Sequence, residues 1–457
     1  MNNSHSGVEA KIGTVIVPAE AYISPEYARA EGEKLWPKVW QIACRVEELE
    51  SVGDYVTYDI LDESIIVVRS AVNKISAYYN VCQHRGRRLT EGCGHSKRFY
   101  CRFHGWSWNL DGSNHSVLDE EDWGGTLDTE DIRLPAVKAD TWGGWVWINM
   151  DPDSESLAHF LGEAKGLLDP FDLDKMRFKW RQWLYFPCNW KTALEAFSES
   201  YHVHASHPQL NRWVSYKNWS RAVGLHGHHG VLRPRDSGDP QQGGSGFLGV
   251  NVRGDADARV AAIEQIEEMV RTLDATTPRG VVDAARRLID ELPEGTSAAD
   301  VSAHLMASAR RDDEARGIHW PEITPEQLQA AGYDWHLFPN SVVLPSLTSA
   351  LCYRARPNGY DPDSCIFEVC ALERFAEGEA PETEWVYEPD QSEEKWRLIL
   401  TQDFSNMPEV QRGMKSKGYS GARTNPVEEV AISHFHEVLS RYMGIGAPSP
   451  VKQRDSQ

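Results

Sequence analysis

The chain has 457 residues, of which 41% are hydrophobic and 25% are charged, and its formal net charge is −21. This length allows two domains with separate cores, and the composition is that of a folded globular protein. The negative charge argues against a nucleic-acid partner, because phosphates would be repelled. No apolar run approaches the roughly 18 residues needed to cross a bilayer, and residues 1–11 lack the pattern of a signal peptide. We therefore expect a cytoplasmic protein that does not enter a membrane.

The first 150 residues divide into a helical segment and a region of strands. Residues 1–40 have helix-like patterns, and Pro25 is placed to begin a helix over Glu26–Trp40. From about Gln41 to Met150, short runs rich in Val, Ile and Tyr alternate with turn residues, which predicts a small all-β domain. The expected strands include Tyr55–Ile60, Ser64–Arg69, Ile75–Asn80 and a closing strand over Trp142–Met150.

Residues 151–457 mix helices and strands without a regular β-α alternation, which predicts an α+β domain. Helical patterns lie at 156–169 and 189–203, and three more lie between Asp255 and Arg316. The later expected elements are strands over Ser341–Pro345, Leu351–Arg356 and Cys365–Arg374, followed by helices around Pro408–Lys417 and Pro426–Tyr442.

Four residues form the first candidate metal site: Cys82, His84, Cys101 and His104. In a reducing compartment, the eight cysteines of the chain are expected to be metal ligands or small buried side chains and not disulfides. Two loops that each offer one Cys and one His suit a [2Fe–2S] cluster in which two thiolates hold one iron and two imidazoles the other. A zinc site is the alternative, although zinc loops usually pair two cysteines and place the histidines later.

The segment between His84 and His104 is basic, with six Lys or Arg residues against the single acidic residue Glu91. Two compatible interpretations exist. Some of the basic side chains pair with carboxylates of a neighbouring subunit or brace the loops, or they form a rim that steers an acidic electron donor toward the cluster. The six residues are Arg85, Arg87, Arg88, Lys97, Arg98 and Arg102.

A second candidate site follows about ninety residues later, where His202 and His207 are separated by four residues. Two histidines and one carboxylate leave positions open on iron(II), where dioxygen and substrate can meet. A five-residue step turns about 140° on a helix, so both imidazoles reach one metal only if the helix ends between them. Pro208 makes such an ending plausible.

The segments around these residues resemble those of a known family. YYNVCQHRGRRL and CRFHGWSWNLDG resemble the two ligand loops of Rieske domains, and NWKTALEAFSESYHVHASHP resembles the iron-binding helix of Rieske oxygenases. The chain is thus similar to the α (oxygenase) subunit of the Rieske non-heme iron oxygenases, the ring-hydroxylating dioxygenase family. The resemblance covers residues 40–150 and 180–210 well and 395–445 reasonably.

The resemblance implies an α+β fold with two domains. An all-β Rieske [2Fe–2S] domain would span residues 41–150, and a helix-grip catalytic domain with an antiparallel sheet would span 151–457. The helical segment 1–40 would pack on the catalytic domain, and 225–335 would be the variable, substrate-side region. Each chain would hold one [2Fe–2S] cluster on Cys82, His84, Cys101 and His104, and one mononuclear Fe(II).

The family pattern also supplies the third iron ligand. Gln-Asp-Phe in WRLILTQDFSNMPEVQRGMKSKGY resembles the late family segment with the ligating aspartate, which points to Asp403 beside His202 and His207. Glu409 is the weaker alternative. His204 would be a pocket residue or lie behind the ligands, and His226, His228 and His229 would lie in a loop beside the pocket.

The acidic residue three positions before the first iron histidine is usually an aspartate in this family, and it carries electrons between subunits. Here that position is Glu199, and we expect it to have the same role. The resemblance implies a trimer in which each Rieske domain reaches the iron of the next subunit. A β subunit accompanies some members of this length, although homotrimers exist too.

The chain lacks a recognisable reductase domain of its own. Its G-x-G-x-x-G at 244–249 follows a polar loop and precedes a strand-like segment, which is the reverse of the dinucleotide-binding context. A separate flavin reductase, a ferredoxin or both would therefore supply electrons from NAD(P)H.

We expect the terminal oxygenase of a multicomponent system, which hydroxylates or dihydroxylates an apolar, aromatic or polycyclic small molecule with dioxygen. The alternative reaction is oxidative N- or O-demethylation. The alternatives from other classes are an electron carrier whose second half is structural and a zinc-held interaction protein.

Overall fold

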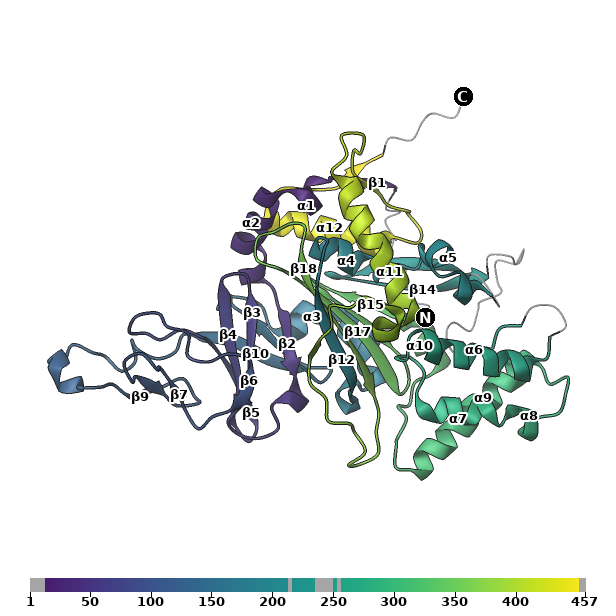
Figure 1. Cartoon of the computed structure of the whole chain (residues 1–457), viewed down its shortest axis with the longest axis horizontal. Coiled ribbons are helices and arrows are strands. Elements are labelled where there is room, and N and C mark those ends of the chain that lie inside the picture. Colours follow the sequence, from purple (N-terminus) through teal and green to yellow (C-terminus); the bar gives the residue numbers. More distant parts are fainter. Residues whose placement is uncertain (1–12, 213–215, 235–249, 253–255, 452–457) are drawn as a thin grey trace, which may run out of the picture.

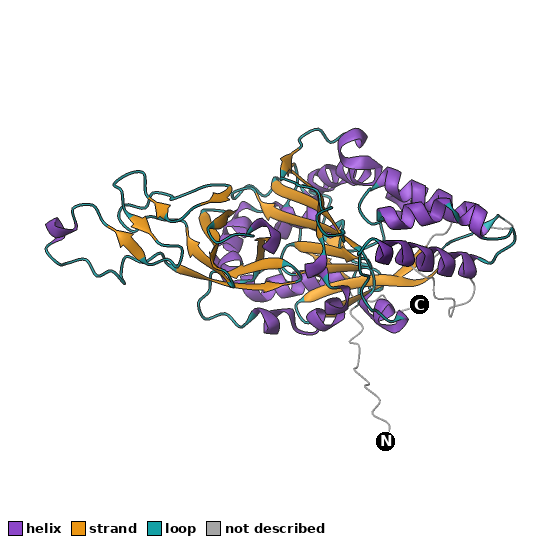
Figure 2. Cartoon of the chain, turned by 90° about the horizontal axis from the view of Figure 1, so that it is seen from below, coloured by secondary structure: helices purple, strands orange, loops and turns teal. Residues whose placement is uncertain are grey.

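Two sheet regions and one group of helices follow one another along the length of the molecule (Figure 1). This computed structural model describes residues 13–212, 216–234, 250–252 and 256–451. The small β domain lies at one end, the largest sheet in the middle, and helices α6–α9 at the other end, as a second view also shows (Figure 2). The G-x-G-x-x-G sequence at 244–249 falls outside the described residues.

The β domain is built on a seven-stranded antiparallel sheet with the order β2-β11-β10-β5-β4-β3-β6. A smaller sheet, β7-β8-β9, extends from it. Its strands are β2 (Gln41–Arg45), β3 (Asp54–Ile60), β4 (Glu63–Ala71), β5 (Lys74–Tyr79), β6 (Cys93–His95), β7 (Phe99–Tyr100), β8 (Ser107–Trp108), β9 (Asn114–Ser116), β10 (Ala136–Trp142) and β11 (Trp145–Asn149).

The predicted closing strand Trp142–Met150 is wrong at its first residues. Trp142 ends β10 and pairs with Trp145, which begins β11. Gly143 and Gly144 turn the chain between them with φ of +63° and +78°. Only glycine adopts this conformation without a steric penalty, so the two glycines make a hairpin of what looked like one strand.

The N-terminal segment packs on the catalytic domain. β1 (Val15–Val17) pairs with β20 (Ala422–Arg423) and β21 (Ser449–Pro450). α1 (Glu20–Ile23) and α2 (Pro25–Lys34) follow, and α2 ends six residues before the predicted end at Trp40. Ser24 caps α2 by accepting a hydrogen bond from the amide of Tyr27.

The catalytic domain is organised around an eight-stranded sheet with the order β13-β14-β15-β16-β17-β18-β12-β19. Its pairs are antiparallel except for β12 with the short edge strand β19. The strands are β12 (Arg177–Phe186), β13 (Tyr216–Val223), β14 (His226–Pro234), β15 (Asp334–Leu337), β16 (Ser341–Pro345), β17 (Ser349–Pro357), β18 (Cys365–Glu373) and β19 (Val386–Tyr387). The α+β prediction with an antiparallel catalytic sheet is confirmed.

Helices α4 (Trp190–Glu195), α11 (Glu393–Met414) and α12 (Val430–Met443) lie over this sheet (Figure 1). The Asn-Trp-Lys sequence that opens α4 anchors it. Asn189 caps the helix by accepting from the amide of Lys191, and Lys191 is fully buried in an ion pair of 2.5 Å with Glu31 of α2. The same carboxylate accepts from the Trp190 indole at 3.1 Å. This contact ties the start of α4 to the N-terminal helices.

The late helices differ from the prediction. α11 does not begin at Pro408 but runs through it, although proline lacks the N–H for a helical hydrogen bond. Buried side chains at helical spacing on both sides of Pro408, among them Phe404, Met407 and Gln411, hold the helix against the sheet. α12 begins at Val430, four residues after the predicted start.

The remaining helices complete the catalytic domain. α3 (Leu157–Leu168) and α10 (Pro325–Ala331) pack on each other. Helices α6–α9 form a unit with its own apolar core, which includes Ala284, Leu288, Val301 and Trp320. They are α6 (Ala258–Thr272), α7 (Arg279–Arg286), α8 (Leu288–Glu291) and α9 (Ala298–Ala315). Within the described ranges, no helix is both long and apolar enough to span a bilayer.

Candidate metal centres

The four predicted cluster ligands lie in two loops with the same backbone hydrogen bonds. In each loop the cysteine amide donates to the carbonyl five positions later, and a glycine amide four positions later donates to the cysteine carbonyl. Gly86 and Gly105 have φ of +75° and +79°, which explains a glycine at the same place in both loops. The bonds join Cys82 with Arg87 (2.9 Å) and Gly86 (2.9 Å), and Cys101 with Trp106 (2.8 Å) and Gly105 (3.0 Å).

The ligand side chains of these loops meet in like pairs. The Cys82 and Cys101 thiols lie close enough to influence each other's pKa, and the rings of His84 and His104 lie 4.6 Å apart between centroids. The Nδ1 atoms of both imidazoles are buried and have no hydrogen-bond partner in the described part of the chain. An unpaired buried nitrogen costs about 1–3 kcal/mol. Both nitrogens are therefore placed to bind a group that the chain itself does not provide.

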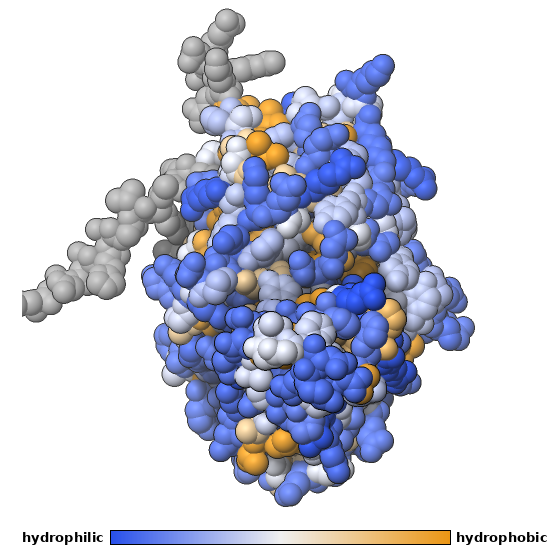
Figure 3. Space-filling model, turned by 90° about the vertical axis from the view of Figure 1, so that its left-hand side faces the viewer, coloured by the Kyte–Doolittle hydropathy of each residue, from blue (hydrophilic) through white to orange (hydrophobic). Residues whose placement is uncertain are grey.

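The surface around the loops is basic and partly aromatic. The six Lys and Arg residues between His84 and His104 are exposed, and Arg88 lies 3.6 Å from Asp59. Phe103 and Tyr100 are also exposed, at 56% and 55%. Figure 3 shows the end of the molecule that carries the β domain as a mainly hydrophilic face with few apolar patches.

The second candidate site is assembled where the chain leaves α4. That helix ends at Glu195, so the predicted helix 189–203 is interrupted, and only the single turn α5 (Val203–Ser206) separates His202 from His207. His207 has φ −122° and ψ 63°, outside the helical region. The expectation that a helix ends between the two histidines is confirmed. This break turns both imidazoles to the same side.

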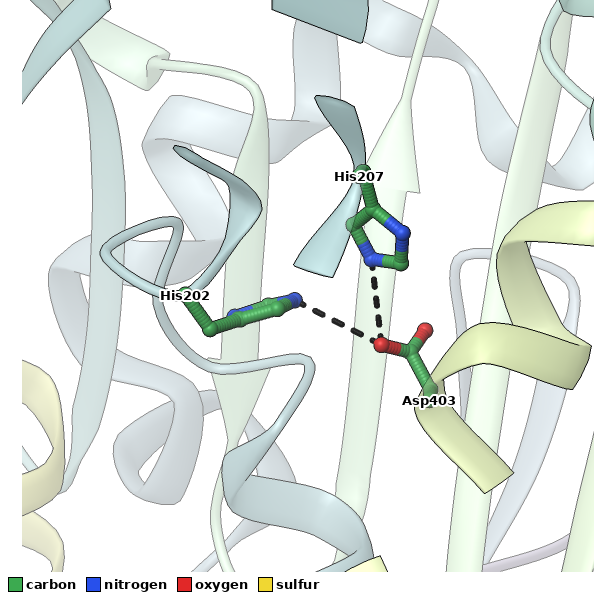
Figure 4. Close-up of side chains that lie close together, drawn as sticks. All are labelled: His202, His207 and Asp403. Carbon is green, nitrogen blue, oxygen red and sulfur yellow. Dashed lines mark ion pairs between the residues drawn. The ribbon is translucent and has the colours of Figure 1, made fainter. Parts of the chain in front are cut away.

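His202, His207 and Asp403 converge although Asp403 lies on α11, far along the chain (Figure 4). One carboxylate oxygen of Asp403 lies 3.0 Å from Nε2 of His207 and 3.6 Å from Nε2 of His202. The three ligand atoms lie within 4.8 Å of one another, and Asp403 and His207 are buried. Two imidazoles and a carboxylate so close together can bind one divalent iron and leave positions open for other ligands.

The Nδ1 atoms of the two imidazoles, on the opposite side of each ring from the metal-facing Nε2, are hydrogen-bonded to other side chains. Nδ1 of His202 lies 2.7 Å from Oε1 of Glu199, and Nδ1 of His207 lies 2.8 Å from Oε1 of Gln402. Gln402 is itself paired with Gln209 through two amide hydrogen bonds. Such partners fix the ring orientation and leave Nε2 free for a metal. Burial lowers the pKa of His202, but the carboxylates of Glu199, Asp403 and Glu429 together outweigh burial and raise it to about 9.

The other residues considered from the sequence lie elsewhere. Glu409 is exposed and paired with Arg412 at 2.6 Å, so it does not join the site. His204 is exposed on α5, and its carbonyl accepts from Asn211. The prediction of a loop at 226–229 is wrong, because these histidines lie in β14. His226 and His228 contact the Phe160 and Ala331 carbonyls, whereas His229 lies 2.7 Å from the hydroxyl of Ser200.

Two families of known proteins match this chain. The Rieske [2Fe-2S] domain matches residues 39–122, and the ring hydroxylating alpha subunit (catalytic domain) matches residues 170–445. The second match alone covers more than half of the chain. The chain belongs to the ring-hydroxylating α-subunit family.

Individual relatives of this α subunit act on different substrates. The carnitine monooxygenase oxygenase subunit of Escherichia coli K12 is 31% identical over 220 residues, which are 46% of this chain and 59% of that protein. The α subunit of biphenyl 2,3-dioxygenase from Rhodococcus jostii RHA1 is 32% identical over 181 residues, which are 38% of this chain and 39% of that protein. The chain therefore matches less than two thirds of either relative's length.

The fold itself is shared along almost the whole chain. A quaternary ammonium Rieske monooxygenase crystallised with L-carnitine superposes with a TM-score of 0.62 and 19% identity, covering 95% of this chain and 97% of that one. At this identity the likeness shows the fold alone.

The cofactors of this family are a [2Fe–2S] cluster and a mononuclear iron, and the side chains fit both. In the described part of the chain, His202, His207 and Asp403 form the compact group that a single ion requires. The four residues in the Rieske loops lie instead as two thiols and two imidazoles. The thiol pair and the imidazole pair correspond to the two halves of a Rieske cluster.

Two sets of polar contacts beside the predicted iron ligands were not predicted from the sequence. Gln402 was within a quoted motif, but its contact with His207 depends on how α11 packs. A second set joins Ser200 to His229 (2.7 Å) and to Tyr333 (2.8 Å), and Asp334 lies 3.6 Å from His229. No local spacing connects these residues, because they come from three separate segments.

The cluster assignment predicts the effect of removing one thiol. Cys101→Ser should abolish the visible absorbance and the electron paramagnetic resonance signal of the reduced cluster, and should destabilise the β domain because cluster binding contributes to its folding. Cys93→Ser is the control, since Cys93 is an exposed residue of β6 outside both loops. A Cys101→Ser protein that keeps both signals would refute the assignment.

The mononuclear assignment predicts a selective loss of metal. Asp403→Ala should lose the single iron and all turnover while the visible spectrum of the cluster stays intact, because the carboxylate that faces both Nε2 atoms is gone. Iron analysis of the purified protein measures this loss. Glu409→Ala, on the same helix but exposed, should retain the iron. Equal iron content in the two variants would show that the third ligand lies elsewhere.

Proposed function

We propose that this protein is the oxygenase component of a multicomponent Rieske monooxygenase that oxidises a cationic, quaternary methylammonium compound. The observation that carries the proposal is a surplus of acidic side chains around the predicted iron site. Asp403 and Glu199 have assigned roles, but Asp334 and Glu429 do not. This proposal corresponds to the demethylation alternative and replaces the apolar aromatic substrate that the sequence alone favoured.

The unassigned carboxylates act electrostatically on the site. Burial raises the pKa of Glu429 to about 7, with a further contribution from Glu199, and Glu429 in turn raises the pKa of His202. Burial also raises the pKa of Asp334, again with a contribution from Glu199. Burial favours the protonated form of these carboxyl groups. A positively charged substrate would favour their ionised form and pair with it, whereas an apolar hydrocarbon would not. The relationship to a carnitine monooxygenase subunit supports the same class of substrate.

The reaction conserves atoms and electrons as follows. A carbon bonded to the quaternary nitrogen is hydroxylated: one oxygen atom of dioxygen enters its C–H bond, the other becomes water, and two electrons and two protons are consumed. The C–N bond of the product then breaks and releases a tertiary amine, an aldehyde and a proton. When the carbon is a methyl group, the aldehyde is formaldehyde. In this scheme the cluster supplies electrons and the mononuclear iron activates dioxygen.

The chain's own residues orient these groups. Glu199 and Gln402 hold the two imidazoles by their Nδ1 atoms, so that both Nε2 atoms face the Asp403 carboxylate. The cluster ligands Cys82, His84, Cys101 and His104 hold the [2Fe–2S] group in the β domain. Electrons come from a separate reductase, directly or through a ferredoxin.

The positions of the two candidate centres at different ends of the chain support an assembly of more than one subunit. In Figure 1 the cluster loops beside β7 lie at one end of the chain, whereas α5 lies well beyond the central sheet. Electrons tunnelling within one chain would have to cross the β domain and the sheet. We propose a trimer in which the cluster of one subunit approaches Glu199 of the next. Oε1 of Glu199 is hydrogen-bonded to Nδ1 of His202, and the Glu199 residue is 8% exposed.

Dihydroxylation of an aromatic ring is the second candidate. It is favoured by a group of stacked aromatic rings on this face of the sheet. The ring centroids of Phe197 and Tyr353 lie 3.9 Å apart, and those of Phe197 and Phe367 lie 5.5 Å apart. The relationship to a biphenyl dioxygenase subunit agrees with it. Aromatic faces also bind quaternary ammonium groups, so these rings are compatible with oxidation of a quaternary ammonium compound as well.

Products distinguish the two candidates. With a surrogate reductase, NADH and dioxygen, the protein should release an aldehyde from at least one of L-carnitine, glycine betaine and choline, in proportion to the oxygen consumed. Chromatography and an aldehyde assay measure this. Naphthalene and biphenyl serve as the comparison compounds. Formation of a dihydrodiol from either hydrocarbon, with no aldehyde from any ammonium compound, would contradict the proposal.

The role of Glu199 predicts a separation of metal binding from electron transfer. Glutamine keeps the size of the side chain but cannot accept hydrogen bonds through two carboxylate oxygens. Glu199→Gln should retain the cluster and the mononuclear iron yet turn over very slowly. Single-turnover kinetics with the cluster reduced in advance measure this directly. Oxidation of the cluster at the wild-type rate would contradict the bridging role.

A further inference from the structure

Asp334 is a buried carboxylate whose Oδ1 atom has no hydrogen-bond partner in the described part of the chain. It is the first residue of β15 and is 4% exposed. Its other oxygen, Oδ2, lies 3.6 Å from Nε2 of His229, the one ion-pair partner that the described residues provide. An orphaned oxygen on a buried carboxylate is costly unless another group binds it.

His229 does not compensate the charge of Asp334. Burial, together with the neighbouring His228 and His202, lowers the pKa of His229 to about 3, so the ring is neutral at physiological pH. The same nitrogen, Nε2, also lies 2.7 Å from the Ser200 hydroxyl. Asp334 therefore faces a neutral imidazole and not a cation.

The sheet register places Asp334 on the side that carries the iron site. His229 pairs directly with Asp334, so both side chains lie on the same face. His336, two residues after Asp334, also shares this face and pairs with Val342, which pairs with Tyr353. Tyr353 thus lies on the same face as Asp334. Phe197, from the segment that leads to His202, stacks on Tyr353.

The carboxylates of Asp403 and Asp334 both act electrostatically on the Tyr353 hydroxyl. The pKa of Tyr353 is raised by burial first, and then by the carboxylates of both Asp403 and Asp334. Glu199 in turn contributes to the raised pKa of Asp334. Asp334, the aromatic pair and the predicted iron ligands therefore surround one region of the domain. A carboxylate beside aromatic faces is a chemistry that recognises ammonium groups.

We propose that Asp334 is the specificity-determining residue for a cationic substrate, with its free carboxylate oxygen facing the substrate's ammonium group. The proposal rests on the proposed function and deepens it. Tyr353 and Phe197 supply the aromatic faces, and Asp334 supplies the counter-charge. An uncharged substrate of the same shape would leave Asp334 protonated, would form no charge pair with it and would bind less tightly.

The competing explanation is structural. Asp334 in its protonated form could donate a hydrogen bond to His229 and stabilise β14 against β15. In that case Asp334→Asn, which retains a donor and the size of the side chain, would change substrate binding little. If Asp334 instead binds a cation, the same substitution removes the counter-charge while the strand remains in place.

The test measures binding without turnover. Isothermal titration of the holoprotein, with the cluster oxidised and no reductase, compares L-carnitine, glycine betaine, choline and the neutral tert-butyl analogue of choline. Wild-type protein should bind at least one ammonium compound, and should prefer choline over its neutral analogue by about 10-fold or more. Asp334→Asn should weaken binding of the best ammonium ligand by about 100-fold, as expected when one partner of a buried charge pair is removed, and should lose the preference.

Proton release provides a second readout that a structural role would not change. Burial raises the pKa of Asp334, so binding of a cation should ionise it and release a proton. Titrations in buffers of different ionisation enthalpy should detect this proton with the wild type but not with Asp334→Asn. Asp334→Glu, which moves the charge but keeps it, should retain the preference for the cation at reduced affinity. It also provides a test if the asparagine variant does not fold.

Asp313→Asn is the matched control. Asp313 is likewise a buried aspartate with a pKa raised by burial, but it lies on α9 and accepts from the Trp320 indole at 2.9 Å. It should bind all four compounds like the wild type. The visible spectrum and the iron content verify that each variant is intact.

The outcomes separate the two proposals. If the wild type binds no ammonium compound and yields no aldehyde, the proposed function fails and the role of Asp334 fails with it. If the wild type prefers the cation and Asp334→Asn preserves that preference, the proposed function stands and the assignment of Asp334 is overturned.

Discussion

The catalytic half of this protein depends on the convergence of two imidazoles from one segment and a carboxylate from another. Gln402 and His207 are 195 positions apart in the sequence, yet their side chains meet at 2.8 Å. The contact requires α11 to lie against the sheet and α4 to end before the histidines. Burial of Asp403 and His207 then makes the group costly without a metal, because neither side chain is hydrated. The surrounding helices, the buried Lys191–Glu31 pair and the sheet register all serve to keep these atoms together.

The β domain meets a similar demand by local means. Each Rieske loop is short, and each is closed by its own backbone hydrogen bonds and a glycine with positive φ. The ligand geometry is therefore defined within a few residues of each cysteine. This domain carries its ligands toward one end of the molecule, and the catalytic domain buries its ligands beneath helices (Figure 1). Such a division suits a protein that receives electrons at its surface and uses them in its interior.

Charge is distributed in opposite ways at the two centres. Basic side chains surround the cluster loops, whereas carboxylates surround the iron site, although the whole chain has a net charge of −21. Under the proposed function, these carboxylates would stabilise a divalent iron and accommodate a positively charged substrate. Asp334 is central to the proposed function, because its free oxygen is not needed by the predicted iron ligands.

What the sequence by itself determined was local. The spacing of Cys82, His84, Cys101 and His104 predicted the paired loops, and runs such as Ser341–Pro345 coincide with the observed strand β16, because loop closure and side-chain alternation depend on neighbouring residues. Family resemblance added Asp403, which no spacing in this chain could provide. The tertiary structure alone decided the rest. It turned Trp142–Met150 into part of a hairpin, continued α11 through Pro408 and placed His226 in a strand. It also brought Gln402 against His207 and Asp334 against His229. These features depend on packing between distant segments, and burial there outweighs the local preferences that a sequence displays.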